Sequence, residues 1–113
     1  MEHLVDRSVS AALFTSSSRD PLPEQARIVV IGGGIIGTST ALHLAEAGER
    51  DVLLLEANVL AGGTTWHAAG LVVGARGTGA LTGLAQYGLA SYAGLGERSG
   101  IDVGFQRPGS LSL

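Results

Sequence analysis

The spacing of hydrophobic positions changes along this chain and predicts where strands and helices lie. The run RIVVI at residues 27–31 is β-branched and apolar on both faces, which predicts a buried parallel strand. Residues 35–47 repeat apolar positions at helical spacing with Gly48 as a C-cap, and DVLLLE at 51–56 predicts a second buried strand. Residues 27–56 are therefore expected to form one βαβ unit of about 30 residues with a right-handed crossover.

The chain that follows this unit has a weaker pattern. Residues 57–79 are rich in glycine and have no clear period. Residues 81–95 return to helical spacing, although each glycine among them costs about 1 kcal/mol relative to alanine in a helix interior. This helix is expected to need tertiary support. IDVGF at 101–105 and GSLSL at 109–113 predict two short strands joined by a tight turn.

The first 25 residues differ from the rest of the chain. The apolar patch Val9–Phe14 is too short for a signal-peptide core, and Glu2 and Asp6 argue against a transit peptide. We therefore expect residues 1–25 to be a flexible tail. Residues 26–113 are interpreted as the N-terminal part of one larger, truncated α/β domain, because two parallel strands and a hairpin would bury little surface.

Composition and charge exclude several classes of function. The net charge is −3 and the chain has no basic run, so nucleic-acid binding is not expected. Cysteine is absent, which excludes disulfides and thiolate metal sites. No apolar stretch approaches the roughly 18 residues that a membrane span requires, so we expect no membrane association and a cytoplasmic location.

Candidate chemistry begins at GGGIIG, which matches G-x-G-x-x-G between the first strand and the helix. Gly32 permits the tight turn, Gly34 lets a diphosphate approach the backbone, and Gly37 allows close packing of helix on strand. The start of the helix then presents unpaired N–H groups and a partial positive charge to phosphates. The predicted cofactor contacts in this loop are Gly32, Gly33, Gly34, Ile36 and Gly37.

An acidic residue completes this pattern. Glu56 ends the second strand about 20 residues after the glycine motif, where a carboxylate accepts hydrogen bonds from ribose hydroxyls. Its charge would repel a 2′-phosphate, which argues against NADP. Strand, helix and acid in register predict a Rossmann-like βαβ dinucleotide-binding unit, as part of an incomplete cofactor-binding domain. The pattern leaves FAD and NAD as alternatives, because both contain the same ADP half.

A second motif, together with the glycine motif, indicates one particular protein family. The stretches RIVVIGGGIIG, LLLE, AGGTTWHAAGL and GFQRPGSLSL resemble the N-terminal region of the dimethylglycine and sarcosine dehydrogenases, within the D-amino-acid-oxidase-like superfamily of FAD-dependent oxidoreductases. The resemblance covers about residues 26–113, and GTTWHAAG is its most selective part. It implies FAD as the cofactor and a secondary or tertiary amine of the N-methylglycine type, such as dimethylglycine or sarcosine, as the substrate. It also implies substrate-binding residues beyond Leu113 and, in a full-length version, a folate-binding domain.

The resemblance assigns roles within the Trp-His segment. In that group the histidine of this motif bonds covalently to the 8α-methyl carbon of the flavin, and the matching residue is His67. A neutral imidazole is a competent nucleophile. Gly62 and Gly63 would permit close backbone approach, Thr64 and Thr65 would lie near the diphosphate or ribitol, and Trp66 near the dimethylbenzene edge. The alternative is a hydrogen-bonded loop histidine beside noncovalent FAD; a metal is not expected, since no second ligand has suitable spacing.

Two other functions stay open at this point. One is a non-catalytic fragment that binds nucleotide weakly or not at all, which is also what 113 isolated residues are expected to be: inactive by themselves. The other is an NAD-dependent dehydrogenase, against which the Trp-His segment counts, because nicotinamide enzymes have no use for a histidine at the flavin 8α position. No catalytic residue can be assigned.

Overall fold

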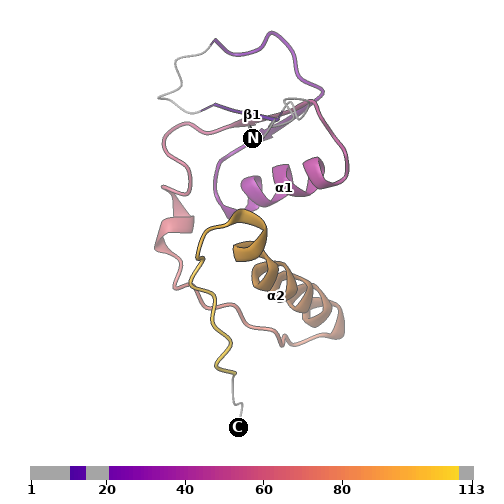
Figure 1. Ribbon diagram of the computed structural model, residues 1–113, viewed down its shortest axis with the longest axis vertical. Helices are drawn as coiled ribbons and strands as arrows, with labels where there is room; N and C mark the ends of the chain where they lie inside the picture. The colour runs from indigo at the N-terminus through magenta and orange to yellow at the C-terminus, as the bar shows by residue number, and fades with distance from the viewer. Residues whose placement is uncertain (1–10, 15–20, 110–113) are drawn as a thin grey trace, which may run out of the picture. The chain divides into compact units, whose positions relative to one another are not determined.

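The computed structural model describes residues 11–14 and 21–109, which divide between two compact units, residues 1–69 and 70–113. The first unit contains a parallel sheet of β1 (Ala11–Phe14), β2 (Ile28–Ile31) and β3 (Val52–Leu55) in the order β1-β3-β2 (Figure 1). β3 is the central strand and holds the buried core, which consists of Val52, Leu53 and Leu54.

The predicted βαβ unit is confirmed. Helix α1 (Ile35–Glu46) connects β2 to β3 and contacts both strands. It ends one residue before the predicted end, with Ala47 as its C-cap, and Gly48 follows with φ +91° and donates its N–H to the Ala45 carbonyl at 3.0 Å. Arg27 joins the starts of the two strands, because its backbone N–H donates to the Asp51 carboxylate at 3.0 Å.

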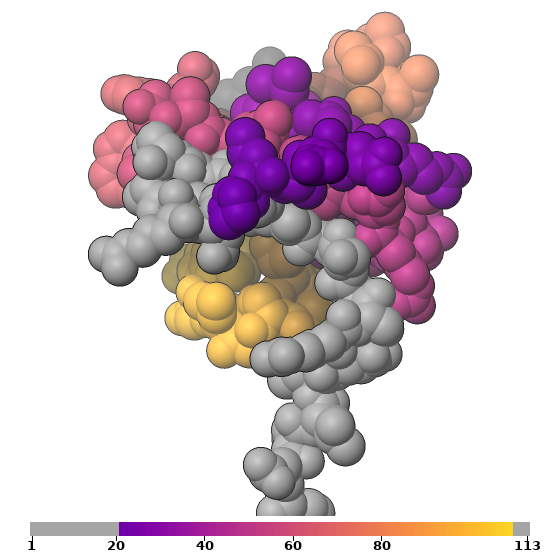
Figure 2. Space-filling view, turned by 90° about the horizontal axis from the view of Figure 1, so that it is seen from above, coloured from indigo at the N-terminus to yellow at the C-terminus, as the bar shows by residue number. Residues whose placement is uncertain are grey.

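The prediction that β2 is buried on both faces is wrong. Val29 is exposed, and Ile31 is 84% exposed, whereas Val30 is half-buried. A Cβ on Gly37 would lie 3.4 Å from Val30 Cγ1, so α1 covers the face that carries Val30. Since β2 is an edge strand and residues alternate between faces, its other face is uncovered. The indigo segment from Pro21 into β2 lies at the surface in Figure 2.

The structure also differs from the expected flexible tail at Ala11–Phe14. These residues form β1 and pair in parallel with β3, Ala11 opposite Val52 and Phe14 opposite Leu55. A central strand has a second edge of N–H and C=O groups that need partners, and the short apolar patch supplies them. The expected tail at residues 1–10 and 15–20 lies outside the described residues.

The second unit is built on α2 (Gly79–Ser99), which confirms the predicted helix and extends it at both ends. The Thr78 hydroxyl accepts a hydrogen bond from Leu81 N at 3.3 Å at its start, and Gly100 ends it with φ +70°. None of its residues is buried. Within the described ranges, neither helix is long and apolar enough to cross a membrane.

The strand predicted at residues 101–105 is wrong. The Asp102 carboxylate accepts a hydrogen bond from Gly104 N at 2.8 Å, and Gly104 has φ +63°, so a local turn interrupts the extended backbone. Phe105 instead stacks on Tyr92 of α2, with ring centroids 5.9 Å apart. Apart from Gly109, the strand predicted at 109–113 lies outside the described residues.

Candidate cofactor-binding site

The glycine motif forms the turn between β2 and α1. Gly32 has φ +104°, and its N–H donates to the Leu55 carbonyl at 2.8 Å, which holds the turn against the end of β3. Gly37 is buried, and a Cβ there would overlap the carbonyl oxygen of Gly32. The third glycine is therefore required by the distance between helix and turn, as the sequence predicts.

Glu56 is fixed at the end of β3 by the backbone around it. One carboxylate oxygen accepts from Gly33 N at 2.7 Å and the other from Asn58 N at 2.8 Å. The N–H of Asn58, followed by that of Gly33, lowers the pKa of Glu56 below its ordinary value, because both bonds stabilise the ionised form. The carboxylate is thus an anion at neutral pH, and its remaining lone pairs can still accept hydrogen bonds.

The segment that follows Glu56 folds back onto the glycine turn. Ala61 N donates to the Gly33 carbonyl at 2.9 Å, and Ala61 has φ +59°, an unfavourable conformation for a residue with a side chain. A Cβ on Gly33 would lie 2.6 Å from Leu60 Cδ2, so the contact admits nothing larger than glycine without a shift of the leucine. This close contact brings the Trp-His segment to the start of α1.

The Trp-His segment contains a 3₁₀ turn, η1 (Thr64–His67), built around the carbonyl of Gly63. That oxygen accepts a hydrogen bond from Trp66 N at 3.1 Å and lies 3.0 Å from His67 Nδ1. The Thr65 hydroxyl accepts a hydrogen bond from Ile35 N, the first residue of α1, at 3.0 Å. Trp66 is 79% exposed and His67 is also exposed.

These elements surround a cavity of about 390 Å³, within the usual size range of small-molecule sites. It is lined by Gly34, Glu56, Asn58, Val59, Ala61, Gly62, Gly63, Thr64 and Thr65. Of the residues predicted from the sequence, six therefore line the cavity: Gly34, Glu56, Gly62, Gly63, Thr64 and Thr65.

The other predicted site residues lie outside this lining. Gly32 and Gly33 belong to the turn between β2 and α1, and Gly37 lies in the first turn of α1. Ile36 is 81% exposed on the first turn of α1. Trp66 and His67 follow the lining residues in η1 without themselves contributing to the wall.

Sequence reasoning missed three lining residues, which are Asn58, Val59 and Ala61, whereas Gly62 was expected to permit close backbone approach. They lie between two predicted contacts, Glu56 and Gly63, so their position in the sequence could have identified them as cavity residues. The positive φ of Ala61, which turns the segment back to Gly33, has no counterpart in residue type, since alanine does not favour that conformation.

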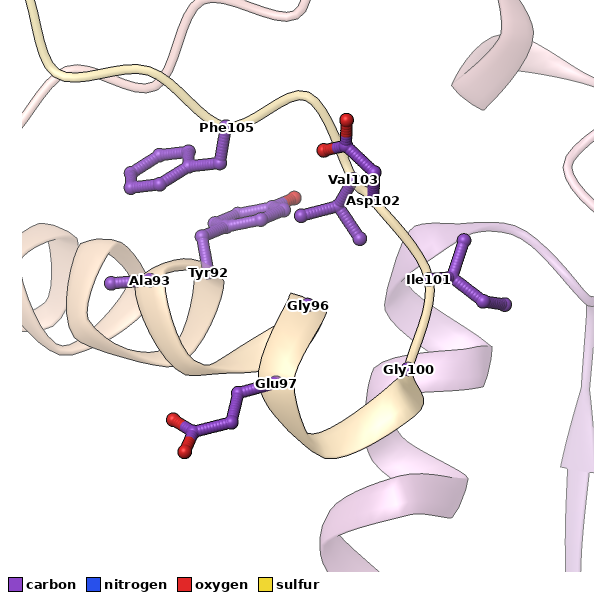
Figure 3. Close-up of a pocket in the computed structure, with 9 residues that line it drawn as sticks. All are labelled: Tyr92, Ala93, Gly96, Glu97, Gly100, Ile101, Asp102, Val103 and Phe105. Atoms are coloured by element: carbon purple, nitrogen blue, oxygen red, sulfur yellow. The ribbon is translucent and has the colours of Figure 1, made fainter.

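A larger hollow of about 480 Å³ lies in the second unit, between the end of α2 and residues 100–105 (Figure 3). Tyr92 and Phe105 stack along it, and the side chains of Glu97 and Asp102 point in different directions. Its polar groups therefore do not converge on one point. Within the described parts of the chain, no three His, Asp or Glu side chains form a metal-binding cluster.

The residues that line the 390 Å³ cavity include the types that bind the ADP half of a dinucleotide, a glycine at a helix start and a carboxylate at a strand end. Gly34 gives a side-chain-free wall at the start of α1, where a Cβ would lie 3.0 Å from Thr65 Oγ1. An ionised carboxylate, suited to ribose hydroxyls, stands at the other wall. Parallel sheet, glycine turn, helix start and acid together define a Rossmann-like dinucleotide-binding unit.

Comparison with known proteins assigns the family. The model of the FAD dependent oxidoreductase family matches residues 27–113, and the chain belongs to this family. The resemblance inferred from the sequence is confirmed. FAD is the dinucleotide of this family, so the NAD alternative is set aside.

Three relatives specify the comparison further. The chain is 63% identical over its full length to 4-methylaminobutanoate oxidase (formaldehyde-forming) of Paenarthrobacter nicotinovorans, covering 14% of that protein. It is 42% identical over 95% of its length to mitochondrial dimethylglycine dehydrogenase of Rattus norvegicus, covering 13% of it. It is 44% identical over 81% of its length to the mitochondrial pyruvate dehydrogenase phosphatase regulatory subunit of Mus musculus, covering 10%. The chain therefore spans about a seventh or less of each relative.

Proposed function

We propose that this chain forms the ADP-binding part of an FAD-dependent oxidoreductase that oxidises a secondary or tertiary amine of an N-methylated amino acid. The observation that carries the proposal is the cavity beside the start of α1, with the ionised Glu56 at one wall and Gly63–Thr65 at the other. The family match and the names of two relatives, an N-methylamino-acid oxidase and dimethylglycine dehydrogenase, support the amine class of substrate.

Each group in the cavity has a distinct role in this proposal. Glu56 accepts hydrogen bonds from the adenosine ribose and rejects a 2′-phosphate by charge. The backbone at Gly34 and the N–H groups of the first turn of α1 hold the diphosphate. Thr64 and Thr65 supply hydroxyl groups along the path toward the flavin. Ile36 and Trp66 are proposed as peripheral contacts, because both side chains are exposed.

We further propose that His67 is the covalent tether. Its Nδ1 lies 3.0 Å from the Gly63 carbonyl oxygen, which can only accept a hydrogen bond, so Nδ1 carries the proton of the neutral ring. The lone pair is then on Nε2, which is the nitrogen available to form the bond. The bond joins Nε2 to the 8α carbon of bound FAD; one proton leaves that carbon, one leaves the imidazole, and the electron pair passes through the flavin to dioxygen.

Acid precipitation tests the tether. The chain is expressed alone and within any longer in-frame product of its gene, incubated with FAD, and precipitated with acid. Yellow colour that stays in the pellet of the wild type and is lost in His67→Ala identifies His67. Colour released to the supernatant from both proteins means noncovalent FAD, and absence of colour contradicts the proposed cofactor.

The proposed reaction removes two electrons from the carbon beside the amine nitrogen. Bound FAD supplies the hydride acceptor, while the protein orients cofactor and amine and excludes water. Anaerobic mixing of the flavin-loaded protein with 4-methylaminobutanoate, dimethylglycine or sarcosine is expected to bleach the yellow colour. Valeric acid, which lacks the amine, is the control and should leave the colour unchanged.

A second function is favoured by one relative, whose name is that of a regulatory subunit. In that case the same cavity binds FAD or another adenine nucleotide for a structural purpose. A flavin-loaded protein that keeps its colour with every amine, yet is reduced by dithionite, would support this function over amine oxidation.

Two predictions from the sequence remain proposals. A cytoplasmic location is one; two of the three relatives carry mitochondrial names. A folate-binding domain in a longer product is the other, and a folate-affinity measurement on such a product would test it.

A further inference from the structure

The Trp-His turn is docked on the rest of the first unit through one side chain. Thr65 is half-buried, whereas Thr64, Trp66 and His67 in the same turn are exposed. Thr65 Oγ1 accepts the hydrogen bond from Ile35 N at 3.0 Å. The other described hydrogen bonds of the turn are local, to Gly63 or within the turn itself. Thr65 is thus the link between η1 and α1.

This hydrogen bond uses the backbone N–H of Ile35, which has no hydrogen-bond acceptor within the helix. The N–H of the first residue of a helix has no partner within the helix, and here the Thr65 hydroxyl supplies it. The hydroxyl also lies 3.0 Å from the point where a Cβ on Gly34 would stand, so the absence of a side chain at Gly34 makes the contact possible. The backbone link from Ala61 N to the Gly33 carbonyl fixes only the entry to the segment.

We propose that Thr65 is a positioning residue for His67. This inference rests on the proposed covalent bond between His67 and FAD. The Thr65 hydroxyl anchors η1 on the start of α1, where the diphosphate is proposed to bind, and so fixes the position from which His67 presents Nε2. His67 is the second residue after Thr65 in the same 3₁₀ turn, so any loosening at Thr65 transfers directly to His67. Misplacement of a reacting group by about 1 Å costs up to about a hundredfold in rate.

The test follows acid-stable flavin over time after FAD is added to the apoprotein. Thr65→Val removes the acceptor and is expected to slow covalent attachment by about tenfold to a hundredfold. Thr65→Ser restores the hydroxyl and is expected to stay within about threefold of the wild type. Thr40→Val makes the same chemical change at an exposed site on α1, where the hydroxyl bonds the Ile36 carbonyl, and should match the wild type.

Two further measurements separate positioning from a loss of folding or of FAD binding. Noncovalent FAD affinity, read from flavin fluorescence in a His67→Ala background, should change much less than the attachment rate in Thr65→Val. The Ile35 amide should exchange with solvent about tenfold faster in Thr65→Val than in the wild type.

The outcomes distinguish this inference from the proposed function. A wild type that attaches flavin and a Thr65→Val that attaches it at the same rate would overturn the role of Thr65 alone. Slower attachment with unchanged exchange at Ile35 would overturn the anchor. A wild type that never forms acid-stable flavin would overturn the tether itself, and the positioning role with it.

Discussion

The glycines at the start of α1 in the first unit and those inside α2 in the second unit have different surroundings. In the first unit, a Cβ on Gly37 would overlap a backbone oxygen, and one on Gly33 would lie 2.6 Å from Leu60. In α2 of the second unit, a Cβ on Gly83 or Gly88 would meet nothing within 4 Å outside the helix's own backbone. Gly37 is therefore required by a neighbouring backbone atom, and Gly33 accepts a side chain only if Leu60 shifts, whereas Gly83 and Gly88 have no such neighbours.

Burial follows the same division. The first unit buries Val52, Leu53 and Leu54 together with Gly33 and Gly37, and its loops are joined by hydrogen bonds between residues distant in sequence. Among residues 70–109 none is buried. The comparison teaches that a high glycine content has no single meaning. Where the chain folds closely on itself, a high glycine content indicates a binding site. Elsewhere, a high glycine content lowers local stability.

A glycine-to-alanine substitution in α1 is expected to have the largest effect on stability. Gly37→Ala should destabilise the first unit by about 3 kcal/mol, because the methyl group cannot be accommodated without moving α1 away from the glycine turn. FAD binding should be lost with it. Thermal unfolding by circular dichroism and flavin retention measure the two effects. An unchanged melting temperature would contradict the close packing described for α1.

Glu56→Gln tests the electrostatics of the cavity without changing its volume. Replacing one acceptor oxygen by an NH₂ group places a donor against a backbone N–H, either that of Gly33 or that of Asn58. We expect FAD affinity to fall about tenfold or more, since hydrogen bonds to charged groups are stronger than neutral ones. Titration monitored by flavin fluorescence measures this. Equal affinity in both proteins would remove Glu56 from the site.

In the second unit, Gly83→Ala is expected to have the opposite sign from Gly37→Ala. The site is exposed and open, so alanine should stabilise α2 by about 0.5–1 kcal/mol. Hydrogen exchange resolved to residues 79–99 should slow, while FAD affinity stays as in the wild type. Faster exchange would mean that a neighbour occupies the space beside Gly83.

The pH dependence of stability gives the smallest and most specific effect. The pKa of Glu56 lies below its ordinary value of 4.5, so its hydrogen bonds stabilise the folded unit above that pH, and this contribution is lost as pH falls through the lowered pKa. Urea unfolding at a series of pH values should show a drop on the acid side of pH 4.5. The difference between wild type and Glu56→Gln should shrink there.

Much of the candidate site follows from the sequence because its signals are local. Gly32, Gly34 and Gly37 are spaced by the geometry of one turn, and Glu56 by the length of one helix and one strand. The bounds of β2, α1 and β3 agree with prediction within one residue at each end. In contrast, Ile36 lies at the surface, because position in the motif does not determine which side of the helix start a residue faces.

The order of residues was enough to predict the βαβ unit, the dinucleotide motif and the family resemblance, because periodicity, turn glycines and a selective motif act over a few adjacent residues. The three-dimensional structure was needed to show that Ala11–Phe14 joins the sheet and that β2 is an exposed edge. The structure also shows that the Thr65 hydroxyl accepts the hydrogen bond from the first N–H of α1. Each of these depends on which groups are left without a partner once distant segments meet, and residue type does not encode that.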